Sequence, residues 1–541
     1  MSDDARNLAS AWEAVSDRIG DAPALAYGPL VRTWTEFEDR AARLASVLSD
    51  AGVGPDDKVA FFLYNGPEYL EVYVAAFKGG FAPVNTNFRY GPEEIVYLFD
   101  NADAEAVVFH AAFSGLVDGV RSRLPQVRRW YRVADGTAPV PAWAVDYESV
   151  VAAGADRIET PWGRSPDDLL LLYTGGTTGM PKGVMWRQDD LFNVLGGGGN
   201  PFVGRPPAAS VEEIASNVDP DQPGIVMLPA CPLMHGTGQF SSFITMNLGG
   251  TIVTLPSRRF DAGELWRESA RNRVNAIVIV GQAFAAPMLA WLDEHGGELD
   301  LSSVFLINSS GVMWSQENKD GLLRHLPQAI LFDSFGSSEA VGLGASVSTS
   351  GSAEETARFA LGENVGVFTD DGRRVEPGSP EPGLVAVSGY IPVGYYKDEA
   401  KTAQTFRTFD GRRWSVPGDW AEVRPDGSLH LLGRGSVCIN TGGEKVFPEE
   451  VEEILKTFEG VVDAVCVGVP DDRFGEAIAA VVEPLDGAEI DRDALATHVR
   501  ASLAAYKAPR HVVLVETIGR APNGKVDYKR LKALAAERVS G

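Results

Sequence analysis

The chain has 541 residues, of which 45% are hydrophobic, and a formal net charge of −26. A chain of this length can bury several cores, so more than one domain is expected. The strong negative charge argues against nucleic acid and anionic membranes as partners, because their phosphates would be repelled.

Short apolar segments alternate with helical patterns through most of the chain. Residues 67–80, PEYLEVYVAAFKGG, predict a helix, because Tyr69, Tyr73 and Phe77 recur at helical spacing and Gly79–Gly80 supplies a stop. Continuous apolar strands separated by helices predict mostly parallel sheets that are covered on both faces. The predicted strands are 59–64, 106–109, 169–173, 226–228, 251–255, 276–280, 304–308 and 329–332.

The residue composition and pattern of the sequence change further along the chain. Residues 196–224 are rich in Gly, Pro and acids and predict a long surface loop or lid. Short strands punctuated by Gly and Pro, such as 382–390, predict a β-rich subdomain at about 345–430. A compact α+β pattern then follows, with helices at 448–458 and 491–505 and strands at 461–469, 477–483 and 512–515.

These patterns predict an α/β fold in two domains. The N-terminal domain, residues 1–433, would hold two doubly covered, mostly parallel sheets and the β-rich subdomain. The C-terminal α+β domain would comprise residues 434–541, with a boundary at Arg434.

The remaining composition predicts a cytoplasmic protein. No apolar run reaches the roughly 20 residues that span a bilayer, and the first residues lack a basic stretch followed by an apolar one. Cys231, Cys438 and Cys466 are widely scattered, which suits a reducing compartment and fits neither a zinc site nor a disulfide framework.

Residues 173–183, YTGGTTGMPKG, directly follow one of the predicted strands. Glycines allow backbone N–H groups to converge on an anion, and threonine hydroxyls and Lys182 add donors and charge. Met180 and Pro181 separate Gly179 from Lys182, so this is not the G-x-x-x-x-G-K-(S/T) P-loop. Composition alone leaves a phosphate loop and a plain glycine turn equally open.

Further strings occur in a fixed order after this one. They are SSGVM (309–313), DSFGSSEA (333–340), VPGDW (416–420), GRGSVCINTGGEKVFPEEVE (433–452) and GRAPNGKVDYKRL (519–531). Each alone is typical of an ordinary turn or, for the last, of a solvated basic face. Together with residues 173–183 they closely resemble the motifs of the adenylate-forming superfamily, which contains acyl-CoA synthetases, luciferases and peptide-synthetase adenylation domains.

The resemblance implies an ATP site and a mobile C-terminal domain. Catalytic roles would fall to Thr177, Lys182, Glu339 and Lys525, with Glu339 and Thr177 holding Mg²⁺, an ion that needs few protein oxygens. Lys525 would supply positive charge where the carboxylate meets the α-phosphate. The implied ATP- or AMP-binding residues are Thr174, Gly175, Gly176, Thr177, Thr178, Gly179, Lys182, Ser310, Gly311, Val312, Asp333, Ser334, Phe335, Gly336, Ser338, Asp419, Arg434 and Lys525.

Three positions depart from the family pattern. Phe335 and Ser338 replace the usual Tyr and Thr. They keep the implied roles, since Phe335 can still stack near the adenine and Ser338 can still bond the phosphate. Ser436 stands at the hinge position, where the family usually has Asp or Lys, so the domain rotation is expected but its pivot is less defined.

The acyl and coenzyme A sites are implied less directly. Residues 225–250 contain no acid, which disfavours an amino-acid substrate, because its ammonium would be buried unpaired. His235 would either gate the acyl pocket or serve as a structural histidine. The expected acyl- and CoA-binding residues are His235, Gln239, Gln282, Met313, Gly442, Gly443 and Glu444, with Phe240 and Phe284 also near the pocket.

The strings at 84–90, 171–186, 391–408 and 433–446 are similar to actinobacterial fatty-acyl and sterol-side-chain CoA ligases. The resemblance implies an enzyme that forms acyl-AMP from ATP and a carboxylic acid and then transfers the acyl group to coenzyme A. Two alternatives stay open, namely transfer to the thiol of a carrier protein and a non-catalytic binding protein of the same fold. A homodimer also stays open.

Overall fold

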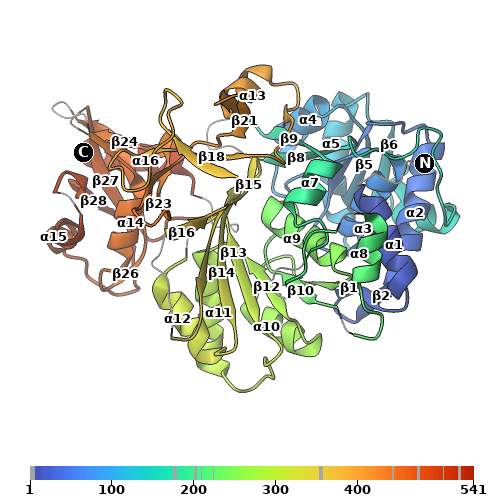
Figure 1. Ribbon diagram of the computed structural model, residues 1–541, viewed down its shortest axis with the longest axis horizontal. Helices are drawn as coiled ribbons and strands as arrows, with labels where there is room; N and C mark the ends of the chain where they lie inside the picture. The colour runs from blue at the N-terminus through green and yellow to red at the C-terminus, as the bar shows by residue number, and fades with distance from the viewer. Residues whose placement is uncertain are drawn as a thin grey trace.

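The computed structural model describes residues 7–174, 180–199, 204–208, 210–222, 224–312, 314–351, 358–362, 364–441, 444–471, 475–503, 505–521 and 526–540. Three sheets organise these residues, and Figure 1 shows them along the chain. The helices, which cover the sheets, are α1 (Leu8–Ile19), α2 (Trp34–Asp50), α3 (Pro67–Gly79), α4 (Pro92–Asn101), α5 (Ser114–Val120), α6 (Tyr147–Ala153), α7 (Gln188–Val194), α8 (Val211–Asn217), α9 (Gly236–Asn247), α10 (Ala262–Arg271), α11 (Gln282–His295), α12 (Gln316–His325), α13 (Glu399–Thr405), α14 (Pro448–Lys456), α15 (Arg492–Ser502) and α16 (Tyr528–Ser540).

An eight-stranded sheet forms the first layer. Alternate residues of β3 face two separate cores, because Val59 and Phe61 pack with α3 while Ala60 and Phe62 pack with α4. This pattern confirms a sheet buried on both faces. The strand order is β19 (Gly394–Tyr395), β9 (Lys182–Arg187), β8 (Leu169–Thr174), β4 (Ala82–Asn85), β3 (Lys58–Phe62), β5 (Ala104–His110), β6 (Arg129–Val133) and β7 (Val145–Asp146).

The second sheet joins the parallel and β-rich parts of the chain. From β11 to β14 its strands are parallel, and from β15 onward they pair antiparallel. Its order is β2 (Leu30–Thr33), β1 (Pro23–Tyr27), β11 (Thr251–Thr254), β10 (Val226–Pro229), β12 (Ala276–Ile279), β13 (Leu306–Ser310), β14 (Ile330–Ser337), β15 (Ala340–Ser348), β16 (Arg358–Leu361), β23 (Leu429–Arg434), β22 (Asp419–Val423), β18 (Gly383–Ser388), β21 (Arg412–Ser415) and β20 (Phe406–Phe409), with β17 (Val365–Phe368) beside β18.

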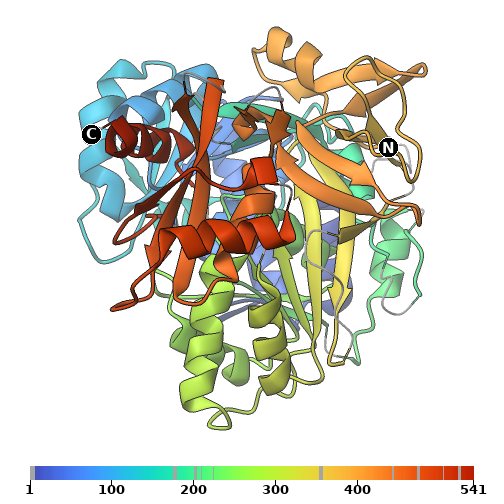
Figure 2. The ribbon, with the colours of Figure 1, turned by 90° about the vertical axis from the view of Figure 1, so that its left-hand side faces the viewer.

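The C-terminal unit has its own five-stranded sheet and its own cores. Figures 1 and 2 show this unit, in red, beside the β-rich part, in yellow and orange. Helix α14 contacts β23, and Phe447, just before α14, brings its ring to 6.2 Å from that of Trp420 on β22. The strands are β25 (Glu444–Val446), β24 (Ile439–Thr441), β27 (Gly475–Pro484) and β26 (Val461–Asp471), with β28 (His511–Leu514) beside β27.

The segment 196–224 differs from its sequence-based prediction. It was expected to be a loop throughout, but residues Val211–Asn217 form α8, which Ser210 caps through the backbone N–H of Glu213. Ile214 is fully buried, and α8 packs against α1. Burial of Ile214 where α8 packs against α1 stabilises a short helix that the surrounding composition does not favour.

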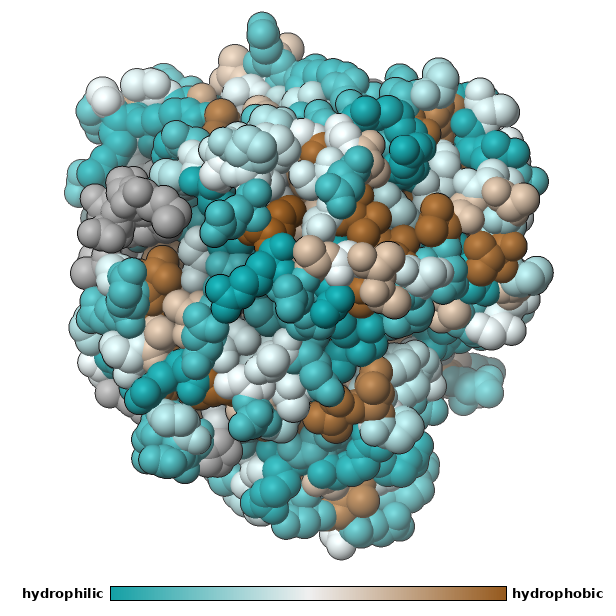
Figure 3. Space-filling view, turned by 90° about the vertical axis from the view of Figure 1, so that its right-hand side faces the viewer, coloured by the Kyte–Doolittle hydropathy of each residue, from teal (hydrophilic) through white to brown (hydrophobic). Residues whose placement is uncertain are grey.

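The surface on the side of the N-terminal helices is mostly hydrophilic. Figure 3 shows its apolar side chains in small groups among polar ones, which is ordinary for a protein surface. Within the described ranges, no helix is both long enough and apolar enough to cross a bilayer.

Candidate functional site

The turn that follows β8 is held at both ends by strand pairing. Thr174 is the last residue of β8 and lies opposite Lys182, the first residue of β9. The Lys182 ammonium forms an ion pair with Asp398, which also caps α13 by accepting the N–H of Lys401 at 2.9 Å. The hydrogen bond from Lys182 lowers the pKa of Asp398, so this carboxylate is charged at neutral pH and holds Lys182 at the edge of the turn.

A second group of contacts joins the segment after β14 to this hairpin. Tyr395 donates its hydroxyl to Glu339 Oε1 at 2.8 Å, and Trp186 donates its indole N–H to the carbonyl of Ser338 at 3.0 Å. Both donors belong to paired strands, since Tyr395 of β19 lies opposite Val184 of β9. The Glu339 carboxylate is therefore fixed close to the strand that begins with Lys182.

The carboxyl end of β13 lies beside the middle of β14. Ser310 is paired with Ser334, whose hydroxyl donates to Asn308 Oδ1 at 2.7 Å. Gly311 has a φ of +88°, a left-handed conformation that favours glycine, and the turn at Gly311–Val312 leaves the strand there. Phe335 is largely buried, with its ring 5.4 Å from that of Phe359.

Asp419 and Arg434 occupy the ends of two adjacent strands. They face each other in the antiparallel pair β22–β23, and the Asp419 side chain is buried. For Arg434, as for Ser436 and Glu444, the description is limited to the backbone. The register alone brings these two expected ATP- or AMP-binding residues together.

Helix α9 has one face that is partly open and one that is buried. Thr237, Ser241 and Ile244 share the open face, and Ile244 is 37% exposed. Gln239 points to the opposite side and is fully buried, and neither atom of its amide bonds to any residue that the structure describes. The open face approaches the β13 turn, because a methyl group added at Gly311 would lie 3.9 Å from Thr237 Oγ1.

Two other residues expected near the acyl group lie at helix ends. His235 is the residue before α9, and Gln282 begins α11, where its Oε1 accepts the N–H of Ser315 at 3.1 Å. Phe240 and Phe284 are buried. Thr237 thus lies near the Gly311 turn, and Ser241 shares its face of α9. Neither was selected from the sequence, although their i, i+4 spacing was visible there.

Several expected site residues lie outside the described residues. They are Gly175, Gly176, Thr177, Thr178, Gly179, Met313, Gly442, Gly443 and Lys525. The described ones include a lysine with a carboxylate fixed close to its strand, a glycine turn after β13, and a buried aspartate at the start of β22. Lys182 follows the carboxyl end of β8 and Gly311 follows that of β13, and open α/β sheets bind ligands outside such strand ends. This arrangement suits an anionic ligand with a polar sugar-like part.

Comparisons with known proteins agree with this geometry. Residues 12–396 match the AMP-binding enzyme family, and residues 450–525 match the AMP-binding enzyme C-terminal domain.

The chain is 42% identical over 538 residues to a 3-oxocholest-4-en-26-oate–CoA ligase of Rhodococcus rhodochrous, covering 98% of this chain and 96% of that protein. It is 41% identical over 542 residues to a medium/long-chain-fatty-acid–CoA/3-oxocholest-4-en-26-oate–CoA ligase of Mycolicibacterium smegmatis, covering 99% and 97%.

Solved structures share the fold. The anthranilate CoA ligase AuaEII in complex with anthranoyl-AMP has a TM-score of 0.84 at 20% identity, covering 99% of both chains. ATP-bound MatB from Rhodopseudomonas palustris has a TM-score of 0.81 at 23% identity, covering 98% of this chain and 99% of that one.

Proposed function

The chain belongs to the AMP-binding enzyme family, and from this premise we propose that it is an ATP-dependent acyl-CoA synthetase. In the first half-reaction, a carboxylate oxygen attacks the α-phosphorus of ATP, forming acyl-AMP and releasing pyrophosphate. In the second, the thiolate of coenzyme A attacks the acyl carbon, forming the thioester and releasing AMP.

One observation supports this proposal above the others. The hairpin that presents Lys182 and the segment that presents Glu339 are tied together by Tyr395 and Trp186, although they lie far apart in the sequence. A lysine and an oriented carboxylate beside a glycine-rich turn can hold a polyphosphate and neutralise the charge that develops on it.

We assign the residues as follows. The turn from Thr174 to Lys182 binds the triphosphate, Asp419 accepts the ribose hydroxyls beside Arg434, and Lys525 approaches the α-phosphate from the C-terminal domain. No covalent intermediate with a side chain is needed, because alignment and charge neutralisation suffice. The purine would lie among Ser310, Gly311, Val312, Asp333, Ser334, Phe335 and Gly336, and Ser338 would bond the phosphate.

The residues present fit Mg²⁺ as a companion of ATP. Tyr395 holds Glu339 through Oε1, which leaves Oε2 to bind a cation, and Mg²⁺ commonly takes one or two carboxylates together with phosphate oxygens. Glu339 and Thr177 would hold the ion, which would offset the negative charge of the phosphates.

The acyl group we propose is a medium- or long-chain fatty acid or a steroid side-chain acid. Relatives that are 38% to 42% identical to this chain are named for such substrates. The open face of α9 supports an uncharged acyl group, because Thr237, Ser241 and Ile244 carry no charge.

We further propose that residues 1–433, with a β-rich subdomain at about 345–430, and residues 434–541 move as two units about Ser436. The separate sheet that begins at β24 supports this boundary. Coenzyme A would contact Gly442, Gly443 and Glu444. A cytoplasmic location and a homodimer remain part of the proposal.

A panel of carboxylic acids tests the function. Medium and long fatty acids, steroid side-chain acids and aryl acids would each be incubated with ATP and either coenzyme A or a carrier protein, and AMP and thioester would be quantified. We expect CoA-dependent AMP release with an aliphatic or steroid acid. Thioester on the carrier alone would favour the carrier alternative, and no ATP–pyrophosphate exchange with any acid would contradict the proposal.

A further inference from the structure

A buried group of three side chains meets at Asp333, in the middle of β14. Lys319 of α12 forms an ion pair with Asp333 at 3.0 Å, measured from Nζ to Oδ2. The indole N–H of Trp314 donates to the same Oδ2 at 3.0 Å, and the Lys319 ammonium lies 5.5 Å from the centre of the indole ring. Lys319 is only 2% exposed and Trp314 is 1% exposed.

Such a buried ion pair is not expected to contribute much to the free energy of unfolding. A lysine on a helix is expected to be solvated, and removing two charges from water costs more than their attraction commonly returns. Burial raises the pKa of Asp333, and the charge and hydrogen bond of Lys319 oppose this rise. The pair therefore keeps a buried carboxylate in one place, which points to a positional role.

The position that it fixes is the turn between β13 and α12. Trp314 holds the end of this turn to Asp333. The next residue, Ser315, donates its backbone N–H to Gln282 Oε1 at 3.1 Å. The turn begins at Ser310, which is paired with Ser334, the neighbour of Asp333. The same contacts thus set the spacing between the end of β13 and the part of β14 that would enclose the purine.

We propose that Lys319 and Trp314 are positioning residues for the nucleotide, acting through Asp333 on the turn Ser310–Val312 and on Ser334–Phe335. This inference rests on the proposed function. Within the described residues, both contacts fall on Oδ2 of Asp333, which leaves Oδ1 able to accept a further hydrogen bond. Neither Lys319 nor Trp314 needs to touch the ligand.

The Lys319→Met variant tests this role, because methionine is unbranched like lysine and lacks the charge. We expect the KM for ATP in ATP–pyrophosphate exchange to rise at least tenfold, while kcat changes less than threefold. Trp314→Phe, which removes only the indole donor, should raise this KM by a smaller factor. Direct titration of ATP binding should show the same order of variants.

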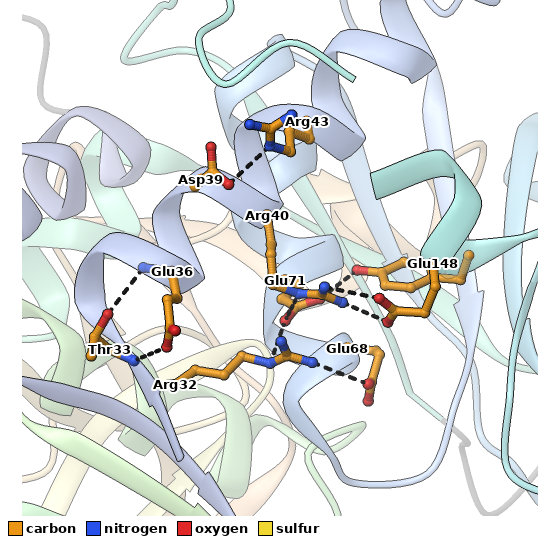
Figure 4. A network of polar contacts seen from close by, with 10 residues as sticks. Arg32, Thr33, Glu36, Asp39, Arg40, Arg43, Glu68, Glu71 and Glu148 are labelled. Carbon is orange, nitrogen blue, oxygen red and sulfur yellow. Dashed lines mark hydrogen bonds and ion pairs between the residues drawn. The ribbon is translucent and has the colours of Figure 1, made fainter. Parts of the chain in front are cut away.

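A loss of folding is separated from this effect by two further variants. Lys319→Met/Asp333→Asn carries no uncompensated buried charge, and Asn can still accept from Trp314, so we expect both Tm and the KM for ATP to recover partly. Arg40→Met provides the matched control. Arg40 of α2 is a largely buried cation that pairs with the buried Glu71 of α3 and with Glu148 of α6, as Figure 4 shows.

Arg40→Met should lower Tm and leave the KM for ATP unchanged. If Lys319→Met lowers Tm as Arg40→Met does but keeps the KM for ATP, the ion pair is only structural and the inference is wrong. A different outcome separates the inference from the proposed function. If the unmodified protein shows no exchange with any carboxylic acid, but Lys319→Met binds ATP more weakly than the unmodified protein in the titration, the inference stands and the proposed reaction fails.

Discussion

The hydroxyl of Tyr395 donates a hydrogen bond to Glu339 Oε1 at 2.8 Å, across 56 positions of the sequence. Tyr395 sits on β19 at the edge of the eight-stranded sheet, whereas Glu339 directly precedes β15 of the larger sheet. The bond therefore joins the two sheets at the point where the proposed ATP site lies. Within the larger sheet, Ser415 of β21 donates to the carbonyl of Glu339 at 2.6 Å and so holds the backbone of this residue.

Replacing Tyr395 by phenylalanine should weaken catalysis more than folding. The ring remains packed, but Glu339 loses the donor that orients it, so we expect a 10- to 100-fold lower kcat/KM for ATP and a higher Mg²⁺ requirement. Titration of activity with MgCl₂, alongside a Tm measurement, checks this. An unchanged Mg²⁺ dependence would show that the bond does not orient a metal ligand.

Lys182 and Asp398 should differ sharply in their effects. Lys182→Ala removes the cation at the end of the turn, and we expect kcat/KM for ATP to fall at least 100-fold. Asp398→Asn retains the cap of α13, because asparagine also accepts from the Lys401 N–H, so a loss below tenfold is expected. Steady-state kinetics with varied ATP measure both values. Equal losses would mean that the ion pair, and not the free ammonium, is required.

Lys525 should separate the two half-reactions. Its charge is needed where two anions meet, so Lys525→Ala should abolish acid-dependent pyrophosphate release. Thioester formation from supplied acyl-AMP should survive. A folded variant in which both half-reactions drop by the same factor would refute this role.

The network in Figure 4 predicts a pH dependence of stability. Burial, followed by the charge of Glu71, raises the pKa of Glu68 to about 7, and the pair with Arg32 at 3.8 Å opposes this only weakly. A raised pKa means that the folded protein keeps a proton that the unfolded chain releases near its ordinary value of 4.5. The free energy of unfolding contributed by Glu68 is therefore full below that value and is lost as pH rises to about 7.

Glu68→Gln should remove this slope. Urea denaturation at pH 5 and pH 8 should show that the unmodified protein loses on the order of 1–3 kcal/mol more than the variant over this interval. Glu148→Gln, an exposed member of the same network, is the control and should keep the slope. Parallel curves for the unmodified protein and Glu68→Gln would place the Glu68 pKa near its ordinary value.

Local patterns gave much of the fold but not its long-range contacts. The helix expected at 67–80 is α3, Pro67–Gly79, and it ends where Gly80 adopts a φ of +69°. Its start and stop depend on adjacent residues, so they are visible in sequence. Helix α8 was missed because a seven-residue helix among Gly, Pro and acidic residues shows no periodicity of its own, and its burial depends on α1.

Some residues of the candidate site could likewise be predicted from local sequence, and others depend on long-range contacts. The motifs predict roles for Lys182, Glu339 and Asp419, because each motif is a short run of adjacent residues that can be recognised in the sequence. Tyr395, Asp398 and Lys319 could not be selected, since an ordinary tyrosine, a helix cap and a helical lysine acquire their contacts only when distant strands pair. Gln239 was selected from the sequence for the acyl site because its side chain is polar. In the structure it is buried on the side of α9 opposite the open face.

The most direct test of the account is a crystal structure with a non-hydrolysable acyl-adenylate mimic. We predict that its phosphate analogue lies against the turn from Thr174 to Lys182, that its ribose hydroxyls contact Asp419, and that its acyl chain follows the Thr237 face of α9. An adenosine bound away from both Thr174 and Asp419 would contradict the account.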